Sequence, residues 1–465
     1  MNSKQMNLFE SSRFEGNGSA FHDPAFTENR NIPIHRWVPW IAGYSAQFID
    51  DVILAFGPSL GLGARPPLVL DPFAGVGTTL VQAMMRGYRT VGFEINPYAT
   101  LASHVKVQSP WIDVGELNRL ITRFRESAVS WHSKRVEPSM RPPQEFRSRI
   151  PFFSPPVERK VLVALDLINS IERPMLRDVF RLAMGSVMVS FSNYSYEPSL
   201  GTRPASGKSL IEDADVAGIL LAKLRHMKAD IQWIQSQFDG HIPPHEQRVF
   251  NEDFLTKANS RLSPDSVDIV ITSPPYMNNY HYVRNSRPQL YWLSLVTDRR
   301  DTQALEEANF GKFWQTVRSR PSVELEFASP SLVKKIEELR ATRVEKGAYG
   351  GLGWANYVAA YIKDCARFLS VLHRVLRPNG MGIVIIGNSI IQGIEFKVDD
   401  ILGEMATEEG FRLEDLRRIR DKRVGASITQ STVRRGRQNG AALYESALIL
   451  RKQSRRREKT RSRTF

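Results

Sequence analysis

The sequence contains a single cysteine, Cys365, in 465 residues. One thiol excludes an intramolecular disulfide and a cysteine-based zinc cluster, and it favours a reducing compartment. Long hydrophobic runs are also missing. No stretch approaches about 18 apolar residues, so we expect no transmembrane helix. The chain starts with polar sequence, which indicates no secretory signal. These absences predict a cytoplasmic protein without a membrane partner.

Acidic residues are in the minority. The chain has 63 Lys and Arg against 49 Asp and Glu, which gives a formal net charge of +14. Such a surplus suits a polyanionic partner, most simply nucleic acid, although a ribosomal or structural basic protein fits as well. The composition, with 42% hydrophobic and 24% charged residues, excludes a mainly disordered or fibrous protein.

A strand, a glycine-rich turn, a helix and a second strand follow one another early in the chain. Residues 68–70 predict a short buried strand, residues 79–86 a helix, and residues 90–94 the second strand. Strand patterns return at residues 248–250 and 267–271. This βαβ rhythm predicts an α/β fold with a doubly wound, mostly parallel sheet.

Two long interruptions divide this pattern into segments. The expected order is a flexible N-terminal arm (1–30), the first part of the core (31–108), an inserted, mainly helical subdomain (109–245), the second part of the core (246–450) with a further mixed insertion (281–350), and a basic tail (451–465). The tail is predicted from eight basic residues against one acid.

The turn at residues 71–78 reads Asp-Pro-Phe-Ala-Gly-Val-Gly-Thr. Glycine serves where the backbone approaches a ligand closely or takes a positive φ. Glu94, at the end of the next strand, is placed to accept hydrogen bonds from both hydroxyls of a ribose. Leu80 stands where a dinucleotide fingerprint has Gly or Ala, and no Walker lysine follows. A ligand with a ribose but no phosphate therefore fits, and S-adenosylmethionine is such a ligand. The alternative is a tight turn without a ligand.

A second segment, Thr-Ser-Pro-Pro-Tyr at residues 272–276, directly follows a predicted buried strand. Ligands bind at the carboxyl ends of strands in open α/β sheets. The two prolines stiffen the backbone and donate no hydrogen bonds, so the Ser273 hydroxyl and the Pro274 carbonyl stand out as acceptors. Two acceptors suit an exocyclic amine, and Tyr276 offers a ring on which an extruded base stacks. The alternative is a proline-rich turn.

Together the two segments resemble the family of S-adenosylmethionine-dependent amino-methyltransferases that act on DNA. The resemblance covers roughly residues 31–108 and 246–450 and implies a Rossmann-like methyltransferase sheet of seven strands. It implies a cofactor site for S-adenosylmethionine made of Asp71, Pro72, Phe73, Gly75, Gly77, Thr78, Glu94, Ile95 and Asp253. It implies a catalytic motif made of Ser273, Pro274, Pro275 and Tyr276. Residues 35–48 resemble the segment ahead of the cofactor loop, and Tyr282 is a candidate for the wall of the base pocket.

The activity that this resemblance implies is methyl transfer to the exocyclic amine of a flipped base in DNA. Ser273 favours cytosine N4 over adenine N6, because Ser-Pro-Pro-Tyr is frequent in the cytosine N4 enzymes. The alternatives are an adenine N6 enzyme, an RNA base methyltransferase and a non-catalytic, cofactor-sensing DNA-binding protein. Cys365 has no proline before it and is expected to be packing, which argues against methylation at cytosine C5. No metal motif is present, and we expect no metal ion.

Double-stranded DNA is therefore the expected partner, and the protein is expected to associate with the nucleoid. Cognate restriction or defence components are further candidate partners, and the sequence leaves the oligomeric state open. The expected phosphate contacts lie in a basic stretch between two late strands, at Arg417, Arg418, Arg420, Arg423, Arg434, Arg435 and Arg437. A solvated charge run is the alternative. The insertions at 109–245 and 281–350 are both candidates for reading the DNA sequence, because 158 residues between Glu94 and Asp253 far exceed a simple crossover.

Overall fold

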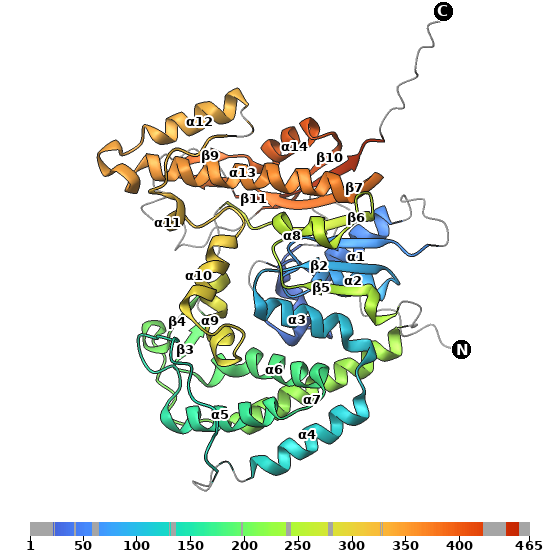
Figure 1. Cartoon of the computed structure of the whole chain (residues 1–465), viewed down its shortest axis with the longest axis vertical. Helices are drawn as coiled ribbons and strands as arrows, with labels where there is room; N and C mark the ends of the chain where they lie inside the picture. The colour runs from blue at the N-terminus through green and yellow to red at the C-terminus, as the bar shows by residue number, and fades with distance from the viewer. Residues whose placement is uncertain are drawn as a thin grey trace, which may run out of the picture.

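The computed structural model describes residues 22, 24–40, 43–57, 65–129, 131, 136–196, 199–238, 243–277, 282–325, 327, 329–421 and 443–454. Within these residues one sheet of seven strands runs through the molecule, with helices on both of its faces (Figure 1). Its strands are β1 (Leu68–Asp71), β2 (Arg89–Phe93), β5 (Gln247–Phe250), β6 (Val267–Thr272), β7 (Leu376–Gly387), β10 (Phe411–Asp421) and β11 (Tyr444–Lys452).

The strand order is β10-β11-β7-β6-β1-β2-β5. All neighbouring pairs from β5 to β7 are parallel, and β11 runs antiparallel to both β7 and β10. The chain winds outward from β1 through β2 to β5, then returns to β6 and continues to the other side. This arrangement confirms the predicted doubly wound, mostly parallel seven-stranded sheet, and its switch point between β1 and β6 is where such sheets bind ligands.

The first βαβ unit forms as the sequence predicts. All four residues of β1 are buried, which is expected of a central parallel strand covered on both faces. Helix α2 (Thr78–Met85) follows a turn whose last residue, Gly77, has φ 84°. A Cβ at that position would lie 3.0 Å from the Ser103 Cα atom, so only glycine fits without a shift.

Alternate residues of β1 face the two helical layers. Val69 packs with Phe48 of α1 (Ala46–Phe56) on one face. Leu70 packs on the other face, in a cluster that includes Phe254 of α8 (Phe254–Arg261) and Phe368 of α13 (Gly351–Val375). Helix α14 (Val398–Glu408) joins the second layer. The two-residue period of the strand thus holds the sheet between two apolar layers.

The described part of residues 109–245 consists mainly of helices. It follows α3 (Pro97–Gln108) and contains α4 (Val114–Ala128), α5 (Pro155–Asn169), α6 (Pro174–Val187) and α7 (Val216–Gln237), with a small hairpin of β3 (Tyr194–Tyr196) and β4 (Leu200–Thr202). These four helices gather in one lobe, on the side of the sheet away from α12 and α14 (Figure 1). Their apolar faces share one core cluster with residues of α3, so the insertion is packed onto the methyltransferase-like core.

The second insertion was expected to be mixed, and its described part contains helices only. They are α9 (Tyr282–Trp292), α10 (Arg299–Ala308), α11 (Trp314–Val317), α12 (Pro330–Arg340) and the 3-10 turn η8 (Val344–Tyr349). Helices α9 and α10 lie between the insertion lobe and the layer of α13 (Figure 1). A hairpin of β8 (Ser389–Ile391) and β9 (Ile394–Phe396) follows β7.

Two expected segment ends are wrong. Residues of the predicted arm form a 3-10 turn, η1 (Phe26–Arg30), in which Asn29 is fully buried. Its amide donates to the Tyr44 carbonyl at 3.0 Å and accepts from the Ala46 N–H at 2.8 Å, which fixes this part of the chain to the start of α1. At the other end, Lys452 belongs to β11 and pairs with Asp265 at 2.6 Å, so the sheet continues into the predicted tail.

The other segment boundaries stay predictions. Residues 1–21 and 455–465 lie outside the described part of the chain. Among the helices that the structure describes, none has the length and apolar character needed to cross a membrane.

Candidate active site

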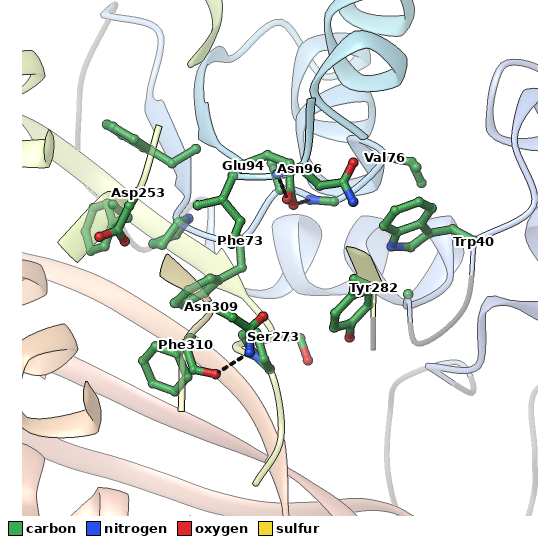
Figure 2. A pocket seen from close by; sticks show the side chains of 18 of the residues that line it. Trp40, Phe73, Val76, Glu94, Asn96, Asp253, Ser273, Tyr282, Asn309 and Phe310 are labelled. Atoms are coloured by element: carbon green, nitrogen blue, oxygen red, sulfur yellow. Dashed lines mark hydrogen bonds between the residues drawn. The ribbon is translucent and has the colours of Figure 1, made fainter. Parts of the chain in front are cut away.

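One pocket opens at the carboxyl ends of β1, β2, β5 and β6, at the switch point of the sheet (Figure 2). Its wall combines stretches that are distant in sequence, among them 72–76, 93–96 and 252–254, together with Ser273 and Pro275. Of the predicted site residues, it contains Pro72, Phe73, Gly75, Thr78, Glu94, Ile95, Asp253, Ser273 and Pro275. The glycine turn and the Ser-Pro-Pro-Tyr motif therefore share one cavity.

The glycine turn is held by the acid that follows β2. Gly75 has φ 50°, and its N–H donates to Glu94 Oε2 at 2.9 Å. Its carbonyl accepts from Ser103 Oγ at 2.6 Å. The second Glu94 oxygen accepts from the Asn96 N–H at 2.7 Å. The loop and the end of β2 are thus locked together, and the glutamate faces the pocket from this junction (Figure 2).

Burial controls the charge of Glu94. Removal from water raises the pKa of its carboxyl to about 7, and the backbone donors of Asn96, Gly75 and Ile95 oppose that rise only in part. Asp71 contributes a further, smaller increase through charge repulsion. The carboxylate therefore titrates near neutral pH, and a partner that donates hydrogen bonds to it favours the ionised form.

Asp71 and Gly77 lie behind the pocket wall. The Asp71 side chain is 1% exposed and accepts from Thr272 Oγ1 at 2.6 Å, from the Tyr44 hydroxyl at 2.9 Å and from the Phe73 N–H at 3.1 Å. Burial is the largest influence on this carboxyl and raises its pKa. Asp71 thus connects the end of β1 to Thr272 at the end of β6, and its bond to the Phe73 N–H stabilises the turn at residues 71–78.

Aromatic side chains and a carboxylate line one end of the pocket. Asp253 caps the start of α8 by accepting from the Leu255 N–H at 3.0 Å. Phe73 and Phe310 meet edge to face at 5.1 Å between ring centroids, and both line the cavity. A flat, apolar slot with an acceptor at its rim suits a purine ring that carries an amino group.

In the Ser-Pro-Pro-Tyr segment, Ser273 and Pro275 line the pocket, while Pro274 and Tyr276 are not part of its wall. The Pro275 carbonyl accepts from the Tyr361 hydroxyl at 3.0 Å, which fixes the backbone of the motif on α13. The Tyr276 hydroxyl donates to Glu445 Oε1 at 2.9 Å. Burial, followed by the charge of Glu445, raises the pKa of this hydroxyl well above its usual value.

Asn309 and Phe310 line the pocket without any signal in the sequence, whereas Trp40 lies in the segment 35–48, which resembles the segment ahead of the cofactor loop. Trp40 stacks on Tyr282 with ring centroids 6.1 Å apart and planes 17° from parallel, and both rings line the cavity. Asn309 and Phe310 come from the second insertion, and the Asn309 amide donates to the Phe310 carbonyl at 2.9 Å (Figure 2). Tyr282 was expected here, and Trp40 belongs to the expected segment 35–48. Asn309 and Phe310 reach the pocket through tertiary contacts that no local pattern predicts.

The predicted phosphate-binding arginines divide into two groups. Arg417, Arg418 and Arg420 lie on β10, and each pairs with an acid: Asp415 at 2.8 Å, Asp421, and Glu445 at 3.0 Å, respectively. The Arg418 guanidinium also lies over the Tyr444 ring. The remaining four lie outside the described residues: Arg423, Arg434, Arg435 and Arg437. A DNA contact of this stretch stays a prediction.

Metal ligands were not expected, and the described ranges contain no group of three or more His, Cys, Asp or Glu side chains that could hold a metal ion. Cys365 lies in the core face of α13. Burial raises the pKa of its thiol well above the usual value, which suits packing rather than reactivity.

Comparison with known proteins gives relatives of one kind. No family model matches the chain. Type II methyltransferase M.BsoBI of Geobacillus stearothermophilus is 24% identical over 83% of this chain and 80% of its own length. M.MvaI of Kocuria varians is 24% identical over 72% and 73%, and M.AvaI of Nostoc sp. is 22% identical over 84% and 82%. Each is described as a type II methyltransferase.

Among solved structures, the rRNA methyltransferase aviRa from Streptomyces viridochromogenes covers 89% of this chain and 87% of its own. Its TM-score of 0.29 and its identity of 9% are too low to carry an argument. The sequence relatives confirm the resemblance to the DNA amino-methyltransferase family, and they support an enzyme that transfers methyl groups.

Proposed function

We propose that the chain is an S-adenosylmethionine-dependent DNA methyltransferase that acts on the exocyclic amine of a flipped base, with cytosine N4 favoured. One observation carries this proposal. The pocket that contains Gly75 and Glu94 also contains Ser273, so a methyl donor and an acceptor amine have a common cavity. Methyl transfer between two bound molecules depends mostly on such positioning.

The pocket suits the cofactor along its whole length. Glu94 presents a half-buried carboxylate where a ribose can donate two hydrogen bonds, and Gly75 leaves the loop without a side chain beside it. Asp253 and the ring of Phe310 suit the adenine, since one accepts a hydrogen bond from an amino group and the other gives a ring contact. When bound, S-adenosylmethionine supplies a methyl group on a positively charged sulfur.

The target base would occupy the part of the pocket near Ser273. Its hydroxyl accepts a hydrogen bond from an exocyclic amine, which turns the nitrogen lone pair away from the ring. The Pro274 carbonyl is proposed as the second acceptor. Neither proline of the motif donates, so the backbone here offers acceptors only. The stacked rings of Trp40 and Tyr282 form an aromatic wall of the same cavity, on which a flipped base can stack.

DNA is the proposed substrate because the relatives are named type II methyltransferases and because the chain is strongly basic. The lobe of α4–α7 and the helices α9–α12 are the proposed elements for sequence recognition. We further propose that the protein acts in the cytoplasm on the DNA of the nucleoid. Its proposed partner is a cognate restriction component.

Nucleoside mass spectrometry tests this function and the choice of base. Purified protein is incubated with DNA and S-adenosylmethionine, and the DNA is digested to nucleosides. We expect N4-methylcytosine, and none with Ser273→Ala as the matched control. If N6-methyladenine is found instead, the protein is an amino-methyltransferase whose target is adenine rather than cytosine. A product at cytosine C5, or no methylated base at all, would overturn the proposal.

A further inference from the structure

Four arginines surround a hollow at the edge of the sheet opposite to the candidate active site. We call it the arginine hollow, and it is lined by Arg65, Leu68, Arg89, Arg248, Arg261, Leu262, Ser263, Asp265 and Ser266. Leu68 begins β1, Arg89 begins β2, and Ser266 directly precedes β6. The hollow thus lies at the amino ends of the strands whose carboxyl ends form the pocket with Glu94 and Ser273.

Positive charge exceeds negative charge around this hollow. Among the described residues that line it, Asp265 is the only acid, and Lys452 already pairs with that carboxylate at 2.6 Å. Arg65 pairs with Asp268, but Asp268 is shared with Arg377, so two guanidinium groups face one carboxylate. The local balance therefore favours an anion.

Two of the arginines have buried nitrogen atoms without a hydrogen-bond partner. They are one terminal nitrogen of Arg89 and the Nε atom of Arg248. Among the described residues, Arg89 contacts Glu246 at 3.9 Å and donates to the Pro66 carbonyl at 3.2 Å. For Arg248 the described part of the chain contains no ion pair. A guanidinium stays charged at every physiological pH, so these donors call for an acceptor.

Arg261, the last residue of α8, is the fourth arginine that lines the arginine hollow. It pairs with Glu252 through two nitrogen atoms, Nε at 2.8 Å and a terminal nitrogen. This pair holds its guanidinium over the Phe250 ring, 5.1 Å from the centroid. Arg261 is thus fixed in place beside the hollow and adds charge to it, while Arg89 and Arg248 retain unused donors.

We propose that the arginine hollow is a second binding site, for a phosphate group. Guanidinium forks match phosphate oxygens with two parallel hydrogen bonds, and the unused donors of Arg89 and Arg248 are the groups that would make them. The phosphate belongs either to the backbone of a DNA segment or to free inorganic phosphate. A DNA segment held here lies on the far edge of the sheet from the proposed reaction, so it is distinct from the duplex that supplies the flipped base. The assignment of the phosphate to DNA rests on the proposed function. The binding of a phosphate group by the arginines does not depend on that function.

Thermal unfolding in phosphate tests the site itself. The full chain is titrated with inorganic phosphate against chloride at constant ionic strength, as wild type, as the double variant Arg89→Gln/Arg248→Gln and as Arg367→Gln. Arg367 lies on α13, is 44% exposed, and serves as a control for the loss of charge elsewhere. Because a ligand of the native state raises its stability, we expect a saturable rise in the midpoint of wild type and control. We expect the double variant to bind about ten- to a hundredfold more weakly.

Salt dependence distinguishes the two sources of phosphate. The affinity for a DNA duplex is measured from low to moderate salt for the same three proteins. A DNA source predicts that the salt slope of the double variant falls by about 0.9, since the site holds one phosphate and each lost phosphate contact lowers the slope by that amount. A loss of the phosphate effect with an unchanged slope identifies free phosphate as the ligand.

The proposal is overturned if phosphate affects all three proteins equally, or if it has no effect on any and the slopes agree. Arg248→Lys keeps the charge but loses the fork, and it covers the case in which the double variant does not fold. An intermediate phosphate affinity in this variant supports the site, and an affinity equal to wild type contradicts it. Methyl transfer is measured in parallel, so a failure of the phosphate site is separate from a failure of the proposed function.

Discussion

The Tyr276 hydroxyl of the catalytic motif donates a hydrogen bond to Glu445 on β11 at 2.9 Å. The other oxygen of Glu445 pairs with Arg420 on β10 at 3.0 Å. Glu445 is only 8% exposed, and each of its carboxylate oxygens has a partner. The two antiparallel strands at this end of the sheet therefore hold the aromatic ring of the motif in place. Arg420 is thus linked to the motif through Glu445, and its predicted contact with phosphate stays a prediction.

Replacement of Glu445 tests this positioning role. Glu445→Gln keeps an acceptor for Tyr276 but removes the charge that Arg420 faces, and Glu445→Ala removes both interactions. Because loss of position costs rate rather than cofactor binding, we expect kcat to fall about tenfold in the alanine variant and less in the glutamine variant. Steady-state kinetics with varied S-adenosylmethionine measure this split. An equal fall in kcat and rise in KM for both variants would indicate a merely structural role.

Ser273 is the most direct point at which to interrupt the reaction. Ser273→Ala removes the hydroxyl that accepts from the target amine and leaves the Glu94 side of the pocket intact. We expect methyl transfer to fall by about a hundredfold or more, with cofactor affinity within about twofold of wild type. Single-turnover methylation and calorimetry measure the two quantities. Wild-type turnover in this variant would remove Ser273 from the mechanism.

Glu94 predicts a pH dependence of both cofactor affinity and stability. Burial raises the pKa of its carboxyl from 4.5 to about 7, and the ionised form is the one that accepts hydrogen bonds from a ribose. We therefore expect the cofactor affinity to increase as the pH rises through about 7. Calorimetry between pH 6 and pH 8 checks this, with Glu94→Gln as the variant in which the pH effect disappears.

The Glu94 carboxyl also lowers the free energy of unfolding of the cofactor-free protein as the pH rises. Its folded-state pKa is raised, so the native state holds a proton that the unfolded state releases, and stability falls between about pH 4.5 and pH 7. Glu94→Gln carries no such penalty. Without cofactor, we expect this variant to exceed wild type in unfolding free energy by up to about 3 kcal/mol at pH 8 and to lose that advantage below pH 5. Denaturant unfolding at both pH values measures the difference, and a pH-independent difference would contradict the explanation.

Asp230 connects the helical insertion to the pocket. From α7 it accepts hydrogen bonds from the Ile34 N–H at 3.0 Å, from Trp37 Nε1 at 2.9 Å and from Arg36. These donors precede Trp40, which lines the pocket. Removal of a buried acceptor leaves the donors unpaired, so we expect Asp230→Ala to cost about 3 kcal/mol of stability.

The same substitution is expected to weaken cofactor binding, because the segment from Ile34 to Trp40 loses its anchor. The control is Asp213→Ala, whose carboxylate is 57% exposed and pairs with Lys160 in the same insertion. Thermal unfolding and calorimetry compare the two variants. Equal, small effects of both would show that Asp230 does not position the pocket wall.

The sequence predicts the parts of this molecule that depend on short-range patterns. The strand at Leu68–Asp71, the turn with Gly77 and the helix after it are specified by residues next to one another, and the structure confirms them. Ser273 and Glu94 were placed at strand ends by the same local reasoning. Their meeting in one pocket follows from the parallel sheet, in which carboxyl ends share an edge.

Contacts between distant segments could not be predicted in this way. Asp71 looks like a cofactor ligand by position, but Tyr44 and Thr272 approach it from 27 and 201 residues away and enclose it. Asn309 and Phe310 enter the pocket from an insertion whose sequence carries no motif. The end of the core was placed too early because a run of charges conceals the last strand residues, of which Lys452 is buried beside Asp265.

The central claim is that one cavity holds the methyl donor and the target amine. A crystal structure of the full chain with S-adenosylhomocysteine and a DNA duplex tests it most directly. We predict ligand density with its ribose hydroxyls on Glu94, its adenine near Asp253 and its sulfur toward Ser273, with a flipped base beside that serine. A cofactor bound elsewhere, or a base that enters the molecule far from Ser273, would contradict the account.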